Sequence, residues 1–442
     1  MKTFTLFILS LLCISGLATT APVVSVMAEE EVYSFTAPNN GSGPMWSYGC
    51  TSIVRLKDEV FVTEVETGKD VPRLCNTRWR LRKRDGGAWT VVAEAEGYRQ
   101  REPVSLGTLS NDSVYLYVND SIMPPGTEYG PCNPHLLRYV AGDVLPPPQT
   151  IQPVWDRETY FTDHSYRGYA ADRAGKRLIM LNIDAKKSTQ HWSWLSGDGR
   201  THGNGHITFP IRSCYPQVAL AGNTAHVLAV GDIVEPVEEW RKLKFERTQR
   251  KWDYVFRRLF YVHAPDLKGA GFGEPLEIAN VDATAGYIGN QDLWIAPDGA
   301  AHILYTQRNV QHAWMRDEFF PEESILNSLH LAVVRDGAVV RRVVLIAGND
   351  QAQPGHARFQ ETAQGALYAL VHMSGAESGN VLLPVPSDDA SPSPIPVPLT
   401  APFGSFMLAN TRAGNAPSNT IDVFGHTTSG TTLNYAQLKI AE

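Results

Sequence analysis

The stretch from Gly289 to Tyr305, G-N-Q-D-L-W-I-A-P-D-G-A-A-H-I-L-Y, has the pattern of a β-hairpin that the rest of the chain repeats. Apolar and polar positions alternate up to the turn at 297–299, and a second alternating run follows that turn. An Asp-Gly pair between two runs of period two is a strong signal for a β-hairpin. Similar units, each with a polar or aromatic leading segment, recur with turns near Asp58, Asn111, Ala174, Gly222, Asp298, Gln364 and Gly414.

This recurrence predicts an all-β fold, a seven-bladed β-propeller of four-stranded antiparallel blades. The turns are spaced widely enough for the roughly 40–50 residues that a propeller blade needs. A strand expected at residues 30–36 has no partner nearby, so we expect it to pair with the end of the chain and to close residues 22–442 into one domain. The alternative is six blades, with the last repeat and its turn Ala413-Gly414-Asn415 acting only as a cap.

Residues 1–21 have the pattern of a secretory signal peptide, with a charge at Lys2, an apolar run over 4–17 and small residues at 18–21. The pattern predicts an exported protein, secreted or periplasmic, that loses Cys13 with the signal. No later stretch is apolar enough to span a bilayer. The net charge of −7 argues against a nucleic-acid partner. The sequence does not indicate an oligomeric state.

Four cysteines remain after the signal: Cys50, Cys75, Cys132 and Cys214. An even count in an exported chain makes two disulfides plausible, and four cysteines allow three pairings. We expect Cys50 to pair with Cys75, because both fall in the same repeat.

Four segments interrupt the repeat pattern. The Pro-rich segments 144–148 and 383–403 are expected to be extended connectors between blades. Insertions at 233–256 and 308–328 extend the fourth and fifth blades, and the first of them is strongly basic and holds Trp240, Trp252 and Tyr254. Long loops on a rigid scaffold often form binding walls, so the aromatic residues favour a sugar-contacting rim over a merely solvated face.

The sequence has no serine-hydrolase elbow, Walker loop, H-E-x-x-H or G-x-G-x-x-G motif. The leading segments are therefore the main source of candidate site residues, because in a propeller they surround the mouth of the central channel. They supply Trp46, Tyr48, Arg99, Arg101, His164, Tyr166, Arg167, Arg212, Tyr215, Tyr287, Asn290, Asp292, His356 and Arg358.

Arginine forks bind carboxylates or sulfates, and His and Tyr transfer protons, so this ring is suited to an anionic sugar. Each residue also has a structural alternative. The tyrosines would wedge blades apart, Arg167 and Arg358 would pair with acids inside the blades, and His302 would be a packed core histidine. His202 and His206 have ligand-like spacing but no third partner, which favours glycan contact over metal binding. We predict no cofactor. A structural calcium ion is left as an alternative, although no loop motif in the sequence supports it.

Three stretches point to a family: N-Q-D-L-W-I-A-P-D-G-A-A-H-I-L-Y, D-H-S-Y-R-G-Y-A-A-D-R-A-G and I-R-S-C-Y-P-Q-V-A-L. They resemble secreted propellers with bacterial-neuraminidase-type repeats, above all propeller-type polysaccharide lyases such as ulvan lyases, and the related propeller rhamnosidases. The resemblance implies that His164 and Tyr215 transfer protons, that Arg212 holds a uronate carboxylate, and that Arg167 or Arg358 supports it. A second catalytic histidine would be His206 or His356. Substrate-binding roles are expected for Arg101, Tyr166, Tyr287, Asn290 and Trp46.

Three hypotheses follow for function. The first is a polysaccharide lyase that uses β-elimination to cleave a uronate-bearing glycan, either sulfated or unsulfated. The second is a glycoside hydrolase, an exo-rhamnosidase or sialidase-like enzyme, which would need two acids at the scissile bond. Among the leading segments, the main candidates for those acids are Asp163 and Asp292. The third is a carbohydrate-binding propeller without catalysis.

Overall fold

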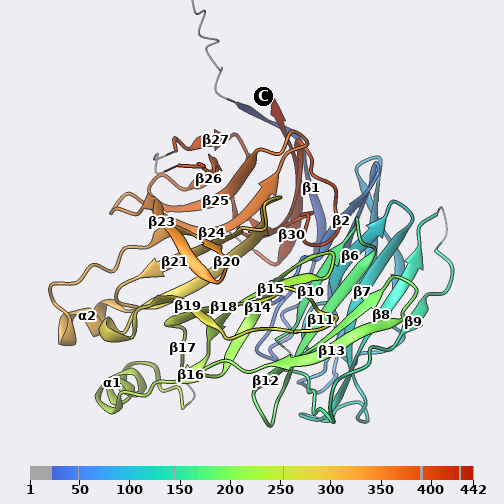
Figure 1. Cartoon of the computed structure of the whole chain (residues 1–442), viewed down its shortest axis with the longest axis horizontal. Helices are drawn as coiled ribbons and strands as arrows, with labels where there is room; N and C mark the ends of the chain where they lie inside the picture. The colour runs from blue at the N-terminus through green and yellow to red at the C-terminus, as the bar shows by residue number, and fades with distance from the viewer. Residues whose placement is uncertain are drawn as a thin grey trace, which may run out of the picture.

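The structure is a computed structural model that describes residues 22–47, 49–142, 145–164, 166–251, 253–388, 392–427 and 430–441. The expected signal peptide, Tyr48 and Trp252 lie outside these residues. Seven four-stranded antiparallel sheets form a β-propeller, as predicted (Figure 1). No helix in the described part of the chain is long and apolar enough to cross a bilayer.

The first three blades follow the chain in order, each from its innermost strand outward. Blade 1 consists of β2 (Ile53–Leu56), β3 (Glu59–Thr67), β4 (Thr77–Asp85) and β5 (Ala88–Glu94). Blade 2 consists of β6 (Ser105–Ser110), β7 (Ser113–Ser121), β8 (Cys132–Val140) and β9 (Gln149–Ile151). Blade 3 consists of β10 (Gly168–Asp172), β11 (Arg177–Asp184), β12 (Thr189–Ser196) and β13 (Thr201–Ile207).

The next three blades repeat this arrangement. Blade 4 consists of β14 (Ser213–Ala221), β15 (Thr224–Gly231), β18 (Arg258–Ala264) and β19 (Leu276–Asn280), and a short helix η1 (Asp282–Thr284) follows it. Blade 5 consists of β20 (Tyr287–Ile295), β21 (Ala301–Arg308), β22 (Ser328–Arg335) and β23 (Ala338–Ala347). Blade 6 consists of β24 (Ala352–Glu361), β25 (Leu367–Gly375), β26 (Gly379–Pro384) and β27 (Ile395–Val397).

Blade 7 closes the ring with both ends of the chain. It consists of β28 (Phe403–Leu408), β29 (Thr420–Thr427), β30 (Thr432–Ala441) and, on its outer edge, the N-terminal strand β1 (Val23–Ser34). β1 runs antiparallel to β30, with Val23 opposite Ala441 and Ser34 opposite Thr432. The six-bladed alternative is therefore wrong, because the last repeat supplies a complete blade.

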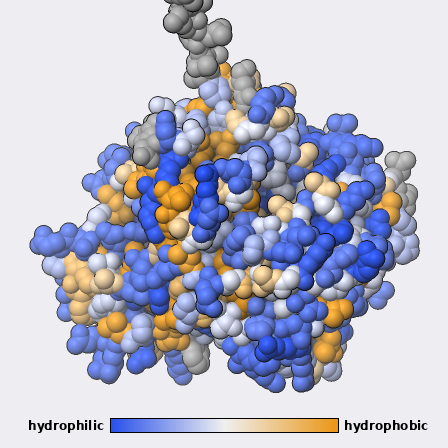
Figure 2. All heavy atoms as spheres, in the orientation of Figure 1, coloured by the Kyte–Doolittle hydropathy of each residue, from blue (hydrophilic) through white to orange (hydrophobic). Residues whose placement is uncertain are grey.

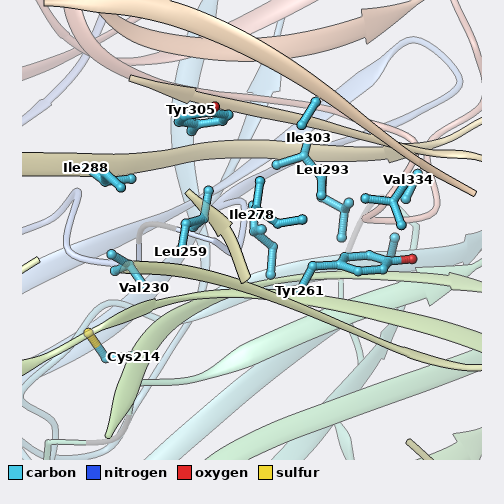
Figure 3. Packing of buried hydrophobic residues seen from close by; sticks show 14 of the residues in the cluster. Cys214, Val230, Leu259, Tyr261, Ile278, Ile288, Leu293, Ile303, Tyr305 and Val334 are labelled. Atoms are coloured by element: carbon cyan, nitrogen blue, oxygen red, sulfur yellow. The ribbon is translucent and has the colours of Figure 1, made fainter. Parts of the chain in front are cut away.

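The core lies between blades, where the faces of neighbouring sheets pack together. Strands such as β11 are buried on both faces and read as nearly continuous apolar runs. Between blades 4 and 5, side chains from β18 and β19 meet those of β20, β21 and β22, as Leu259, Ile278, Leu293, Ile303 and Val334 show (Figure 3). Hydrophilic side chains cover much of the outer surface, and apolar ones show between them (Figure 2).

The interrupting segments differ from expectation. Residues 233–256 are not a simple basic loop: they form a short ribbon of β16 (Ile233–Val234) and β17 (Tyr254–Val255) around helix α1 (Glu238–Thr248). Helix α2 (Ala313–Phe319) belongs to the blade 5 insertion (Figure 1). The Trp240 ring of α1 packs edge-on against Phe320, with centroids 5.4 Å apart. The Pro-rich segments also differ, because 144–148 falls inside blade 2 and 383–403 contains β27.

The loop between β28 and β29, residues 409–419, fills the channel at the end that carries the hairpin turns. The N–H groups of Thr108 and Ala171 donate to its Ala413 and Arg412 carbonyls at 2.8 Å, so it contacts the innermost strands of blades 2 and 3. A Cβ on Gly414, whose φ is +83°, would lie 1.7 Å from the Thr108 carbonyl oxygen. Only glycine fits this close approach. The channel therefore has a blocked end and an end that faces the leading segments.

The cysteines do not follow the expected pairing. All four described cysteines are buried, and the structure shows them as thiols. The Cys50 thiol donates to the Arg167 carbonyl at 3.3 Å, whereas the neighbour of Cys75 is Cys132. The expected Cys50–Cys75 pairing is therefore not supported by the structure.

Buried histidines make the stability of the fold depend on pH. Burial lowers the pKa of His226 to about 3 and the pKa values of His302 and His330 to about 4. Below the unfolded pKa of about 6.5, these histidines bind protons in the unfolded chain but stay neutral in the folded chain. Stability is therefore full above about pH 6.5 and falls as the pH drops, by up to about 1.4 kcal/mol per pH unit for each histidine.

Urea titrations at several pH values between 7 and 4.5 test this expectation, with His302→Gln as the matched variant because glutamine does not titrate. The free energy of unfolding of His302→Gln should fall less steeply with decreasing pH than that of the wild type. Equal slopes for both proteins would contradict the expectation.

Candidate functional site

The leading segments of several blades meet around two adjoining hollows at the open end of the channel, which together we call the cup. One hollow, of about 370 Å³, is bounded by Tyr215, Phe256, Tyr287, Asn290 and neighbouring residues. The other, of about 460 Å³, is bounded by the segment 35–46, blade 6 and blade 7. Three residues line both hollows: Trp46, His356 and Arg358. None of the residues that line either hollow is Asp or Glu.

A row of aromatic rings crosses this end of the molecule. The His164 ring lies 4.2 Å from the Tyr166 ring, and the Tyr166 ring lies 4.9 Å from the Tyr215 ring, both edge-on. Tyr215 also meets Trp46 edge-on at 5.9 Å and Phe256 at 5.8 Å. Edge-to-face contacts of this kind fix ring orientations. The row unites residues from the leading segments of blades 1, 3 and 4, which lie far apart in the sequence.

Two of these tyrosines have strained backbone. The φ angles are +41° for Tyr166 and +50° for Tyr215, a region that bulky residues rarely adopt. Tyr215 sits in an irregularity of β14, between the pairs made by Cys214 and Gln217. Such strain costs on the order of 1–3 kcal/mol and is concentrated at functional sites. The positions of these two rings in the row are maintained by the surrounding packing.

Arg212 presents a guanidinium next to this row. Its guanidinium carbon lies 5.0 Å from the Tyr166 ring centre and 5.4 Å from that of Tyr254, which β17 supplies. Its Nη1 donates to the carboxylate of Asp232, which is buried at the end of β15. The Arg212 side chain keeps 26% of its surface exposed. One edge of the guanidinium is thus fixed by Asp232, and the side chain remains accessible to a ligand.

The protonation of His164 follows from its contact with Arg101. His164 Nδ1 lies 2.5 Å from Arg101 Nη1, which also donates to Asp163 Oδ2 at 3.1 Å. A guanidinium only donates, so Nδ1 accepts and the ring proton of neutral His164 is on Nε2. Burial and the charges of Arg101 and Arg212 lower the pKa of His164 to about 3. His164 is therefore neutral near pH 7 and offers an N–H donor.

His356 has the complementary protonation. Its Nε2 lies 2.6 Å from the Phe406 carbonyl oxygen, which only accepts, so the ring proton is on Nε2 and Nδ1 is bare. Burial and the charge of Arg358 hold the pKa of His356 well below its usual value. Nδ1 makes no hydrogen bond to a described residue. The half-buried ring on the cup wall therefore offers a proton acceptor.

Arg358 is almost fully buried beneath the cup. Its Nη1 donates to the carbonyls of Gln291 and Ala357. Burial lowers its pKa to about 10, and the nearby Asp292 carboxylate opposes this shift. Arg358 thus adds positive charge at the base of the cup. Tyr287 and Asn290, on β20, lie on the blade 5 side of the same hollow.

Two expected residues have other positions. Arg167 is buried, donates to the carbonyls of Tyr117 and Pro103, and has its Nε 4.0 Å from the Glu102 carboxylate, so it holds blades together. His206 is not in the cup but on β13, the outermost strand of blade 3, where its Nδ1 lies 2.8 Å from Asp156. It lines a separate hollow of about 700 Å³ with Trp192 and Phe272.

A metal ion has no evident site in the described part of the chain, where no group of three or more His, Cys, Asp or Glu side chains is arranged to hold one. His202 is not part of such a group and packs against the Trp194 ring at 5.4 Å.

Sequence reasoning missed three contributors: Asp232, Tyr254 and Phe256. Asp232 follows β15, the second strand of its blade, and an antiparallel second strand returns to the face from which the first began. The ends of second strands could thus have been added to the candidates. Tyr254 and Phe256 come from the insertion, whose ribbon places them beside blade 4.

The fold and the cup define a β-propeller with its hollow at one end of the central channel. Among solved structures, the polysaccharide lyase Uly1 is similar, with 10% identity, a TM-score of 0.52, and 94% of this chain and 99% of that chain covered. An ulvan lyase of family PL25, bound to a glucuronate–sulfated rhamnose unit, is similar at 9% identity and a TM-score of 0.52, with 95% of each chain covered.

An α-L-arabinanase of Penicillium chrysogenum also matches, at 10% identity and a TM-score of 0.41, over 95% of this chain and 98% of that chain. No protein-family model and no curated protein matches the sequence. At these identities the likeness establishes the propeller fold. Neuraminidase-type repeats and a relation to rhamnosidases are not shown.

Proposed function

We propose that the cup binds a uronate-bearing polysaccharide and cleaves it by β-elimination. The observation that carries this proposal is the composition of the cup: arginine, histidine and tyrosine side chains surround hollows that no Asp or Glu side chain lines. The Arg212 fork is suited to pair with the carboxylate of a uronate. Neutralising that carboxylate stabilises the carbanion-like transition state that forms when the C5 proton is removed.

The protonation of His356, on the cup wall, and of His164, in the row of rings beside the cup, supports a division of roles. His356 Nδ1 has an available lone pair and takes the C5 proton in this proposal. The Tyr215 phenol gives a proton to the leaving O4, and the Nε2–H of His164 supports the charge that develops there. The C5–H and C4–O4 bonds break, and a C4–C5 double bond forms. His206, which the resemblance offered as the second histidine, has no part in this scheme.

A hydrolase that uses two carboxylates is less well supported. Asp163 and Asp292 are both buried, and they are paired with Arg101 and Arg412. Neither lines the cup. A glycosidase of the usual type needs two carboxyl groups on either side of the scissile bond. The hydrolase and the carbohydrate-binding module are retained as outcomes of the test.

The test is an incubation of the protein with glucuronate- and iduronate-containing algal and plant polysaccharides. Elimination gives an unsaturated uronate that absorbs at about 235 nm, because removal of the C5 proton creates a conjugated double bond. New reducing ends without this absorbance would show hydrolysis, and binding without either product would show a carbohydrate-binding module.

His356→Gln should lower kcat by about 100-fold or more, because it removes the proposed base. His206→Gln is the matched control, because it removes a carboxylate-bound histidine outside the cup. Equal activity of His356→Gln and wild type would refute the role of His356.

A further inference from the structure

The thiols of Cys75 and Cys132 are neighbours in space although they belong to different blades. Cys75 lies between β3 and β4 of blade 1, and Cys132 begins β8 of blade 2. Both residues are 8% exposed, and the Leu74 N–H donates to the Glu128 carbonyl at 3.4 Å, which joins the loop before Cys75 to the loop before Cys132. Cys75 is close enough to raise the pKa of Cys132. Cys50 has a different setting, since its thiol donates to the Arg167 carbonyl, and Cys214 lies near Asp232.

We propose that Cys75 and Cys132 form a disulfide that links blade 1 to blade 2 and braces the wall that carries Arg101 and His164. Two buried cysteines on adjoining loops, each on a segment fixed by backbone hydrogen bonds, are candidates for a cross-link between blades 1 and 2. The remaining two cysteines stay reduced.

The segment around Cys75 supports Arg101. Thr77 and Gln100 exchange two backbone hydrogen bonds, both of 3.0 Å, and Arg101 is the next residue. The Asn40 amide donates to Asn76 Oδ1 at 2.9 Å, to the Leu74 carbonyl at 3.1 Å, and to the Arg101 carbonyl at 3.3 Å. Movement of the Cys75 segment would therefore shift Arg101.

The segment around Cys132 supports His164 in the same way. The Cys132 N–H donates to the Phe161 carbonyl at 2.8 Å, and Pro131 forms a bridge with Thr162. Asp163 and His164 follow directly. Arg101 contacts both of these residues. A bond between the two sulfurs would therefore link the segment that holds Arg101 to the segment that holds His164.

The chemistry is thiol–disulfide exchange with an external disulfide such as oxidised glutathione. One protein thiolate attacks the external disulfide and releases one thiol, and the second thiolate then displaces the other thiol and completes the protein disulfide. Two protein thiols lose two protons and two electrons, and one external disulfide gains them. The Cys75 neighbour and burial raise the pKa of Cys132, so exchange should be slow in the folded protein and faster during folding.

Peptide mapping under non-reducing conditions tests the pairing. The full chain with Cys13→Ser is refolded from the reduced, denatured state in a buffer of oxidised and reduced glutathione, and free thiols are then alkylated in denaturant. We expect one Cys75–Cys132 cross-linked peptide and complete alkylation of Cys50 and Cys214. Alkylation of all four cysteines, or a cross-link that includes Cys50 or Cys214, would overturn the proposal.

Thermal unfolding supplies a second measurement. Cys75→Ser, Cys132→Ser and the double variant should each lower Tm by about 5 °C relative to the oxidised protein, and the losses should not add. Reduction should lower the Tm of the oxidised wild type but not that of the double variant. Cys50→Ser, the control, should still respond to reduction. An unchanged Tm on reduction of the cross-linked protein would refute the bracing role.

The effect on the cup rests on the proposed function and has its own readout. If the cup cleaves a uronate polysaccharide, the reduced protein should lose activity at a lower temperature than the oxidised protein. Absence of cleavage in both forms would argue against the proposed function and leave the mapped disulfide unaffected. Cleavage with identical heat inactivation in both forms would argue against the bracing role alone.

Discussion

Arg212→Ala is expected to lower kcat/KM for a uronate polysaccharide by about 100–1,000-fold, because it removes the charge that would stabilise the developing carbanion. Arg212→Lys keeps the charge but loses the planar fork, so it should recover only part of this loss. The measurement is the initial rate of ultraviolet absorbance at several substrate concentrations. Arg250→Ala is the matched control, because Arg250 is an exposed arginine of the basic insertion outside the cup.

Arg212 also pairs with the buried Asp232, so the variant needs a readout that a purely structural role would not change. Esterifying the substrate carboxylates removes the charge that Arg212 would bind. The wild type should then lose most of its advantage over Arg212→Ala, whereas both proteins should retain cooperative unfolding. An equal ratio of wild-type to variant rates on charged and esterified substrate would show that Arg212 does not act through the carboxylate.

Arg412→Met is expected to lower the free energy of unfolding by about 3–5 kcal/mol, because it removes one guanidinium from the buried Asp292 carboxylate and leaves three further buried acceptors without their donor. The Arg412 guanidinium donates to the Gly49 and Val218 carbonyls and to Gln217 Oε1, each at 3.0 Å, and it also pairs with Asp292. It thus connects the channel loop of blade 7 with blades 1, 4 and 5. Asp292 is 1% exposed, so water cannot replace the lost contact.

Urea unfolding measures this loss, and a second substitution identifies its cause. Asp292→Asn in the Arg412→Met background tests the coupling of the two groups, and the double variant should lose less stability than the sum of the two single variants. Arg335→Ala is the matched control, because Arg335 pairs with Asp298 at the exposed hairpin face and should contribute at most about 1 kcal/mol. A loss for Arg412→Met no larger than that for Arg335→Ala would refute the role of Arg412 as a central brace.

The alternation of apolar and polar residues allowed the fold to be predicted in some detail. It located the hairpins at Asp298 and at the other turns, and from them the number of blades, because the period of two is a local property of each strand. The leading-segment argument brought together Trp46, His164, Arg212, Tyr215 and His356 from four blades, and the structure places them all at the end of the molecule that carries the cup.

A position in the sequence does not specify how far a strand lies from the channel, nor which groups a side chain binds, and the misplaced residues differ from expectation in these two properties. His206 was grouped with the site, yet it lies on the fourth strand of its blade, which is at the outer edge of the sheet. Arg167 and Arg212 looked equivalent as sequence positions, but the first is bound by backbone carbonyls and the second keeps an accessible surface. Helix α1 was missed because its strongly basic sequence has no apolar face that would indicate a helix.

The blades, their order and the end of the ring at which the leading segments gather could therefore be read from local patterns. These properties follow from residues close together in the chain. The protonation of His164 and His356, the neighbour of Cys75, and the position of the loop that carries Arg412 became known from the folded chain alone. Each of these depends on a contact between segments that meet only when the ring closes, and no local pattern encodes such a contact.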